Sequence, residues 1–276
     1  MEILVCLEGS ESTQRAIDVA IDLARTLPAG LVGLAIVDRP DIVAGAATSI
    51  GGASFRRDRD AALLADAHEH ARTWLTDFVG RARRARVAAR ALEIAGSPVE
   101  MILAEVPRHD LTVIGRDVNF RFETQDHDRF TRDRILRRAG KPILVVPDPP
   151  GPGKGAVLVA YDGSPAAARA LHSFVDCGLA RDREVHVTTV NDDGARAFEI
   201  ATRGCALLSR LGIRAIADNV VSTETTAAAL LSRRTKIGAG MMVIGGYIPS
   251  PLARLVWGSV THEVVEHAAV PVFLHY

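Results

Sequence analysis

The sequence is poor in cysteine and in aromatic residues, has no excess of charge of either sign, and contains no long apolar run. Its three cysteines, Cys6, Cys177 and Cys205, are scattered without CxxC spacing, so we expect reduced thiols in a cytoplasmic protein and no disulfide framework. Basic and acidic residues balance at 33 each, so no overall field attracts nucleic acid or an anionic membrane. No segment is suited to cross a bilayer, and the first residues lack the basic region of a secretory signal.

Three motifs occur twice, in the same order, along the 276 residues. EILVCLEGS from Glu2 recurs as AVLVAYDGS from Ala156, LTVIG from Leu111 as MMVIG from Met241, and KPILVV from Lys141 as VPVFLH from Val270. Because chance rarely preserves order, these matches indicate duplication of a whole domain. We expect an N-terminal domain over 1–147, a proline- and glycine-rich linker over 148–155, and a C-terminal domain over 156–276.

In each half, apolar strands alternate with amphipathic helices, which is typical of a parallel sheet covered on both faces. We predict strands near 3–7, 31–37, 87–94, 111–115 and 142–146, and again near 157–161, 185–190, 214–220, 242–245 and 270–275. The last strand of each copy could pair with its counterpart, which would make the chain an internal pseudo-dimer. The glycine-rich segment 38–55 is interpreted as a mobile insertion or as a segment buried on a partner. A long helix is expected over 57–83.

Motifs in the second half carry a resemblance to a known family. The run DGSP from Asp162, between an apolar strand and an alanine-rich helix, resembles the opening of universal stress protein (UspA-type) domains. The runs VIGGY from Val243 and WGSVT from Trp257 resemble the closing stretch of that family. The resemblance covers both halves, and it implies an α/β fold of two tandem, doubly wound, parallel five-stranded sheets. Their strand order would be 3-2-1-4-5, HUP/Rossmann-like, and family members often hold an adenine nucleotide at the ends of strands one and four.

The resemblance implies a nucleotide site in the second half. Its residues would be Tyr161, Asp162, Gly163, Val190, Gly245, Gly246, Tyr247, Gly258, Ser259 and Val260. In the family's phosphate loop, glycines permit a sharp turn and close approach to phosphate, and a Gly-Ser pair opens a helix whose free N–H groups hold the anion. Ile248 stands where the second glycine belongs, so adenosine with its first phosphate fits more securely than a triphosphate.

Several of these residues have more than one interpretation. The Asp162 carboxylate could accept the ribose hydroxyls or support Mg²⁺ near phosphate, and the alternative is that it caps the following helix. The backbone of Val190 could meet the adenine edge, or the residue could belong to the core. Tyr247 could cover the ligand or pack as an ordinary aromatic side chain.

The first half departs further from the family pattern. Glu8 replaces the aspartate, and Val118 stands at the second glycine position. The Gly-Ser pair falls on 128–129 when the count runs forward from Gly115, and on 129–130 when it runs back from Pro142. In both registers the anion site is damaged, so we expect no nucleotide in this half.

These observations favour a universal stress protein with two tandem domains, acting as an adenine-nucleotide-binding regulatory module in the stress response. ATP, ADP or AMP would bind in the C-terminal domain, with Mg²⁺ as a further ligand, and no catalytic residues or metal ligands are predicted. The sequence shows no base paired with a nucleophile, so any ATP hydrolysis should be weak and incidental. The alternative is a non-nucleotide interaction or ligand-binding protein in which both sites are degenerate. The protein partner is not identified, and a homodimer of the whole chain stays open.

Overall fold

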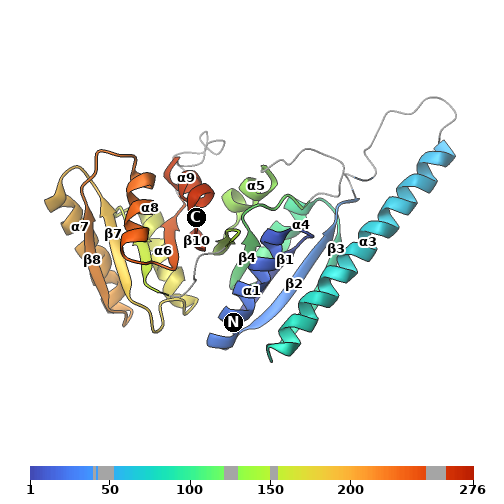
Figure 1. Ribbon diagram of the computed structural model, residues 1–276, viewed down its shortest axis with the longest axis horizontal. Helices are drawn as coiled ribbons and strands as arrows, with labels where there is room; N and C mark the ends of the chain where they lie inside the picture. Colours follow the sequence, from blue (N-terminus) through green and yellow to red (C-terminus); the bar gives the residue numbers. More distant parts are fainter. Residues whose placement is uncertain (40–41, 43–52, 121–129, 150–154, 247–258) are drawn as a thin grey trace. The chain divides into compact units, whose positions relative to one another are not determined.

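The computed structural model describes residues 1–39, 42, 53–120, 130–149, 155–246 and 259–276, with no side chains described at 53–56 and 130. Contacts divide the chain into two compact units, Met1–Arg138 and Ala139–Tyr276. Each unit has its own sheet strands and covering helices, as Figure 1 shows. No described helix combines the length and the apolar character needed to span a membrane.

The first unit is built on four parallel strands in the order β3-β2-β1-β4. The strands are β1 (Glu2–Leu7), β2 (Gly30–Val37), β3 (Ala89–Ala95) and β4 (Leu111–Gly115). The helices are α1 (Glu11–Thr26), α3 (Ala53–Arg84), α4 (Pro98–Glu105), the short 3-10 helix η1 (Val106–Arg108) and α5 (Phe130–Arg138). Helix α1 packs on β1 and β4, α3 packs on β2 and β3, and α4 packs against α5. The strands β1 and β4 are almost wholly buried, as expected for the middle of a covered parallel sheet.

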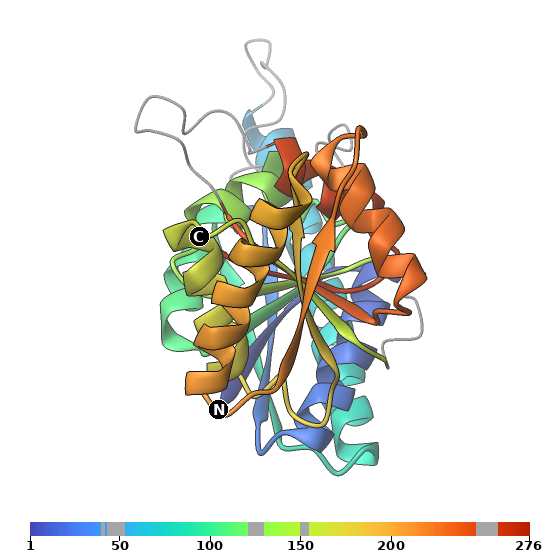
Figure 2. The same ribbon diagram turned by 90° about the vertical axis from the view of Figure 1, so that its left-hand side faces the viewer.

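The second unit contains six strands in the order β5-β10-β9-β6-β7-β8. The strands are β5 (Ile143–Val146), β6 (Val157–Ala160), β7 (Val185–Val190), β8 (Ala215–Val220), β9 (Met241–Gly245) and β10 (Val272–His275). The helices are α6 (Pro165–Asp176), α7 (Gly194–Arg210), α8 (Thr226–Lys236) and α9 (Ser259–His267). Figure 2 looks at this unit, and its orange helices α7 and α8 lie on opposite sides of the strands.

These units refine the predicted arrangement of two five-stranded sheets. The second unit has the complete predicted order, because β8-β7-β6-β9-β10 corresponds to 3-2-1-4-5. The first unit has only the first four strands of that order, since β5 groups with the second unit. There β5 pairs antiparallel with β10, with Leu144 opposite Phe273. The predicted pairing of the two terminal strands is therefore confirmed, and this pairing explains why the contact boundary falls before 148–155.

The segment 38–55 is only partly described. Residues 40–41 and 43–52 lie outside the described residues, so the predicted mobile insertion stays a prediction. Helix α3 begins at Ala53, earlier than the sequence indicated, and continues to Arg84. Most of the predicted linker, 150–154, also lies outside the described residues.

At the same position of the core, the glycine lies on the strand in the first unit and on the helix in the second. In the sheet registers, Val5 aligns with Gly33 and Ala91, and the equivalent row of the second unit is Val159, Val187 and Ala217. A side chain on Gly33 would begin 2.5 Å from the ring of Phe78, a fully buried residue of α3. In the second unit the strand carries Val187, and the glycine is Gly204 of α7, whose added Cβ would lie 2.7 Å from Val187. Each helix can approach its sheet because one partner has no side chain.

In the second unit, a buried carboxylate of β8 links helix α8 to strands β7 and β8. Asp218 of β8 is only 6% exposed, and its two oxygens accept hydrogen bonds from Nε and Nη2 of Arg233 at 2.8 and 2.7 Å. The hydroxyl of Thr188 on β7 donates a third bond at 2.9 Å. This network fixes α8 on β7 and β8.

Candidate functional site

The carboxyl end of the first strand carries an acid, a glycine and a serine in both units. In doubly wound sheets, ligands bind at the carboxyl ends of the strands, where the connections reverse direction. The two acids, Asp162 after β6 and Glu8 after β1, make different contacts, and this difference defines the candidate site.

In the second unit the acidic residue makes a local contact. Oδ1 of Asp162 accepts a hydrogen bond from the backbone N–H of Ser164 at 2.9 Å, which stabilises a turn around Gly163, whose φ is +81°. The helix cap is Ser164, whose Oγ accepts from the N–H of Ala167 at 3.1 Å. The interpretation of Asp162 as the helix cap is therefore wrong. Asp162 and Gly163 are exposed, so the carboxylate is accessible at the strand end.

Gly245 is required by a close approach between β9 and α6. A Cβ at this position would lie 2.6 Å from the backbone of Ala166 and Ala167, in the first turn of α6. Gly115 has the same relation to the first turn of α1, where a Cβ would lie 2.8 Å from the carbonyl carbon of Ser12. The glycine at the end of the fourth strand thus brings that strand end beside the first turn of the helix that follows strand one.

Gly246 is required by an aromatic contact that the sequence did not reveal. The ring of Tyr276 lies 2.0 Å from the position where a Cβ of Gly246 would be. The Gly246 N–H also donates to the carbonyl of His275 at 3.0 Å. Any ligand at the end of β9 would therefore have Tyr276 as a neighbour. The signal was missed because Tyr276 follows a different strand and is remote in sequence.

Tyr161 and Val190 lie at the ends of neighbouring strands. The Tyr161 side chain is buried against Gly204 of α7, and burial raises the pKa of its phenol. Its N–H donates to the carbonyl of Thr188 at 3.0 Å, and its carbonyl accepts from the Thr189 hydroxyl at 2.7 Å. Val190 ends β7 and is partly exposed, and its contact with an adenine stays a prediction.

The phosphate side of the predicted site is only partly described. Ser259 begins α9 and is exposed, and Val260 in the same first turn is partly exposed. Tyr247 and Gly258, with Ile248 between them, lie outside the described residues. The structure thus brings the ends of β6 and β9 together, and the roles of Tyr247 and Gly258 stay predictions.

In the first unit the acidic residue accepts hydrogen bonds from a different loop. Oε2 of Glu8 accepts from the backbone N–H of Asn119 at 3.1 Å and of Phe120 at 2.7 Å, in the segment after β4. The Glu8 carboxylate therefore occupies two amide donors of the loop that, by the family resemblance, would bind phosphate. The extra methylene of glutamate gives the side chain the reach for this contact.

Other side chains pack on the segments that flank Glu8 and the loop after β4. Trp74 of α3 lies against Gly9, with its ring 3.1 Å from the position where a Cβ would be. Val118 and Phe120 are buried. The guanidinium of Arg132, which is wholly buried, donates to the carbonyl of Arg116 at 2.8 Å. These contacts give a physical basis for the expected loss of the first anion site. The contact of Trp74 with Gly9 was not predicted, because Trp74 lies in a helix beyond the glycine-rich segment, far from Gly9 along the chain.

The helices after strand four bear on the two registers left open by the sequence. Helix α5 is Phe130–Arg138 and α9 is Ser259–His267. Aligning the two helices from these first described residues places Phe130 opposite Ser259, which is the register given by the count back from Pro142. The residues before each helix lie outside the described residues, so the choice between the two registers stays a prediction.

We expect the Glu8→Gln variant to show a pH-dependent difference from wild type. Burial raises the pKa of the Glu8 carboxyl, so the folded state favours its protonated form. As the pH falls through this raised pKa, wild type should become more stable relative to the uncharged variant. As the pH rises through it, wild type should lose this added stability. Urea denaturation of both proteins between about pH 7 and about pH 4 measures this difference.

The control for this prediction is Glu100→Gln. The Arg138 side chain lowers the pKa of Glu100, so wild type should lose stability relative to this variant as the pH falls. A difference between wild type and Glu8→Gln that does not change with pH would contradict the assignment of Glu8 as a carboxyl whose pKa is raised by burial.

The comparisons with solved structures show the fold of the whole chain. A universal stress protein from Archaeoglobus fulgidus DSM 4304 matches with a TM-score of 0.72 and 19% identity, over 99% of this chain and 97% of that chain. A functionally unknown protein from Pseudomonas aeruginosa PAO1 matches with a TM-score of 0.56 and 12% identity, over 99% and 92%. A universal stress protein family protein from Arabidopsis thaliana, solved with AMP bound, matches with a TM-score of 0.36 and 16% identity, over 53% of this chain and 91% of that chain.

Sequence comparison identifies the second half. No curated protein sequence matches the chain significantly. The family model described as "Universal stress protein family" matches residues 155–274, which include β6 to β10 and the strand ends described above. Residues 155–274 therefore belong to the universal stress protein family.

Proposed function

We propose that the second unit binds an adenine nucleotide, ATP, ADP or AMP, at the carboxyl ends of β6 and β9. The chain would act as a nucleotide-responsive regulatory module in a stress response. The first half would be a second, degenerate copy of the same domain, which does not bind nucleotide. A cytoplasmic location follows from the reduced cysteines expected from the sequence.

The observation that carries this proposal is the different use of the two strand-end acids. Glu8 accepts N–H groups of the loop after β4 in its own unit. Asp162 accepts only the N–H of Ser164, two residues along the chain, among the described residues. The exposed carboxylate of Asp162 thus keeps acceptor capacity for a ligand, whereas the capacity of Glu8 is used within the protein.

The chemistry of the described residues supports binding of the nucleoside end of such a ligand. The Asp162 carboxylate would accept ribose hydroxyls, and it would also attract Mg²⁺ if phosphates lie nearby. Gly163 adds no side chain above the strand end, and the partly exposed Val190 would meet the base through its backbone. The start of α9 at Ser259 would contribute free N–H groups to a phosphate.

We further propose that this is a binding module and not a turnover enzyme. A hydrolase needs a positioned base next to the attacking water. The described contact of Asp162 is with a backbone amide, and the sequence offers no nucleophile paired with a base. Any hydrolysis of bound ATP would therefore be slow and incidental.

We expect Asp162→Asn to weaken adenine-nucleotide binding about tenfold, because a carboxylate is a stronger acceptor than an amide for ribose hydroxyls. Asparagine keeps the side-chain oxygen that accepts the Ser164 N–H, so the turn should remain. Isothermal titration calorimetry with ATP and with AMP on the full chain measures the affinity and the number of sites.

The matched control is Glu8→Gln at the equivalent strand end. It should leave the nucleotide affinity unchanged, and the wild-type stoichiometry should be one nucleotide per chain. An Asp162→Asn titration indistinguishable from wild type would overturn the proposed site. Absence of binding in the wild-type protein would favour the alternative, a non-nucleotide interaction protein with both sites degenerate.

A further inference from the structure

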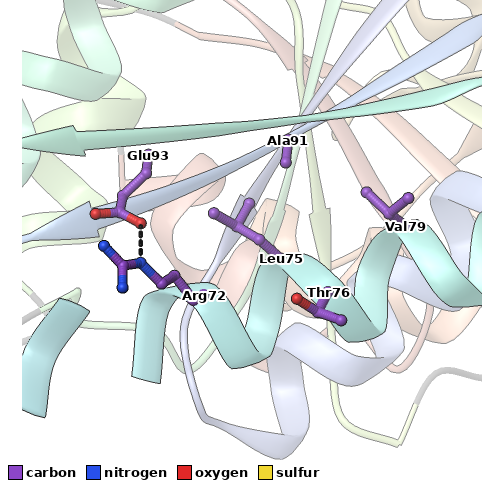
Figure 3. Close-up of a pocket in the computed structure, with 6 residues that line it drawn as sticks. All are labelled: Arg72, Leu75, Thr76, Val79, Ala91 and Glu93. Carbon is purple, nitrogen blue, oxygen red and sulfur yellow. Dashed lines mark ion pairs between the residues drawn. The ribbon is translucent and has the colours of Figure 1, made fainter. Parts of the chain in front are cut away.

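A groove runs along the outer edge of the first unit, between α3 and β3 (Figure 3). Its volume is about 450 Å³. It is lined by Arg72, Leu75, Thr76 and Val79 of α3 and by Ala91 and Glu93 of β3. The helix residues follow i, i+3, i+4, i+7 spacing, so one stripe of α3 forms one wall. The edge strand forms the other wall.

The groove is open because the helix-facing residues of β3 are mostly small. Side chains of a strand alternate between its faces, and Ala91 and Glu93 face α3. Ala89 and Ala95 share that face by the same alternation. Three of these four positions are alanine, so only small methyl groups of the strand lie opposite Leu75, which is 6% exposed, and Val79, which is partly exposed.

The same positions of β3 direct their backbone groups away from the sheet. The N–H of Leu31 donates to the carbonyl of Ala88, and the N–H of Gly96 donates to the carbonyl of Val37. With Leu31 paired to Ala89 in a parallel register, the even-numbered residues of β3 bond to β2. The N–H and C=O groups of Ala89, Ala91, Glu93 and Ala95 therefore point to the outer edge, where β3 has no further strand among the described residues.

The charged residues that line the groove are Arg72 and Glu93, and further arginines follow Val79 on helix α3. The Arg72 side chain is 75% exposed, and its Nε lies 3.8 Å from Oε2 of Glu93. The other oxygen of Glu93 contacts Nδ1 of His68 at 2.5 Å, so Glu93 is engaged on both sides. At the other end, helical spacing from Val79 continues the stripe to Arg83, and Arg83, Arg84 and Arg86 are exposed. Arginine thus flanks the apolar part of the groove at both ends.

We propose that this edge binds an extended acidic peptide of a partner protein by strand addition to β3. The peptide backbone would pair with the outward N–H and C=O groups of Ala89, Ala91 and Glu93. One apolar side chain of the peptide would lie over Ala91, between Leu75 and Val79. An acidic side chain two positions away, on the same face of the peptide, would accept hydrogen bonds from Arg72. This surface lies in the first unit and does not depend on nucleotide binding.

The test starts from selection of random linear peptides against the full chain. We expect enrichment of sequences in which an acidic residue stands two positions from an apolar one. The selected peptide, labelled with a fluorophore, should lose about tenfold in affinity on Ala91→Pro, because proline removes one outward N–H. The pairing with β2 does not use that group, so the variant should fold. Binding should also slow hydrogen exchange of the Ala91 and Glu93 amides.

The chain supplies a matched control at the other edge strand. Ala217 occupies the position of Ala91 in the row of the second unit, and Ala217→Pro should leave peptide affinity unchanged. If Ala91→Pro fails to fold, Thr76→Glu, an exposed substitution in α3, should weaken binding by repelling the acidic peptide. Equal affinities for wild type, Ala91→Pro and Thr76→Glu would overturn the proposal. A wild-type dimer that Ala91→Pro converts to monomer would also overturn it, because a second copy would then occupy the edge.

Discussion

The Gly33→Val variant should lower the free energy of unfolding of the first unit by about 3 kcal/mol, at the upper end of the cost of overpacking a core. A Cβ at Gly33 would lie 2.5 and 2.7 Å from two ring carbons of Phe78 and 3.0 Å from a methyl carbon of Leu7. The Phe78 ring is fully buried, so it can move only by displacing α3. Urea denaturation followed by circular dichroism measures the loss.

Two companion variants make this prediction specific. Gly30→Val places the same side chain on the same strand, but its Cβ would have Ala88 O at 3.9 Å as its nearest neighbour. Its effect should stay within about 0.5 kcal/mol. In the Phe78→Ala background the added valine should fill part of the cavity, so the two losses should be non-additive by at least about 1 kcal/mol. Strict additivity would show that the two residues do not compete for one space.

The Arg233→Ala variant should destabilise the second unit by about 3 kcal/mol, at the lower end of the range for breaking a buried ion pair. The Asp218 side chain is 7% exposed and would lose two of its three hydrogen bonds, keeping the one from Thr188. The lower end applies because the Arg233 side chain is 33% exposed, so water reaches the pair. Thermal and urea denaturation measure the loss.

The control for this second prediction is an exposed pair of the same unit. Arg203 and Glu199 contact each other with side chains that are 65% and 64% exposed, so Arg203→Ala should change the free energy of unfolding far less than Arg233→Ala does. Adding Asp218→Asn to Arg233→Ala should recover part of the stability, because it removes the uncompensated buried charge. Equal losses for Arg233→Ala and Arg203→Ala would show that Asp218 is not the reason for the effect.

Much of the fold follows from local sequence signals. Buried runs such as Ile3–Leu7, and the amphipathic stretches between them, were sufficient to predict nearly every strand and helix, because burial on both faces demands continuous apolar residues. The internal repeat predicted that terminal strands 142–146 and 270–275 pair, and β5 does pair with β10. The sequence did not predict that this pairing assigns β5 to the second compact unit, since such grouping depends on contacts across the whole chain.

The candidate site was less accessible to prediction. The motif placed Asp162 and Gly245 at the correct strand ends, but it could not distinguish an N-cap from a turn at Asp162. The close approach of Gly245 to α6, and of Gly246 to Tyr276, involves residues remote in sequence. The groove between α3 and β3 could not be predicted either, because alternate alanines on an edge strand leave a groove only where a helix lies across that strand.

The sequence by itself determined the duplicated order of elements, the parallel strands and the unequal state of the two strand-end motifs. Those features depend on periodicity and on residue identity, which neighbours along the chain define. Only the tertiary structure decided which groups Glu8 and Asp162 contact, because hydrogen bonds have short range and their partners come from distant segments. Folding brings the ends of strands one and four together in each unit. As a result, the Glu8 carboxylate is used within the protein, whereas the Asp162 carboxylate is exposed.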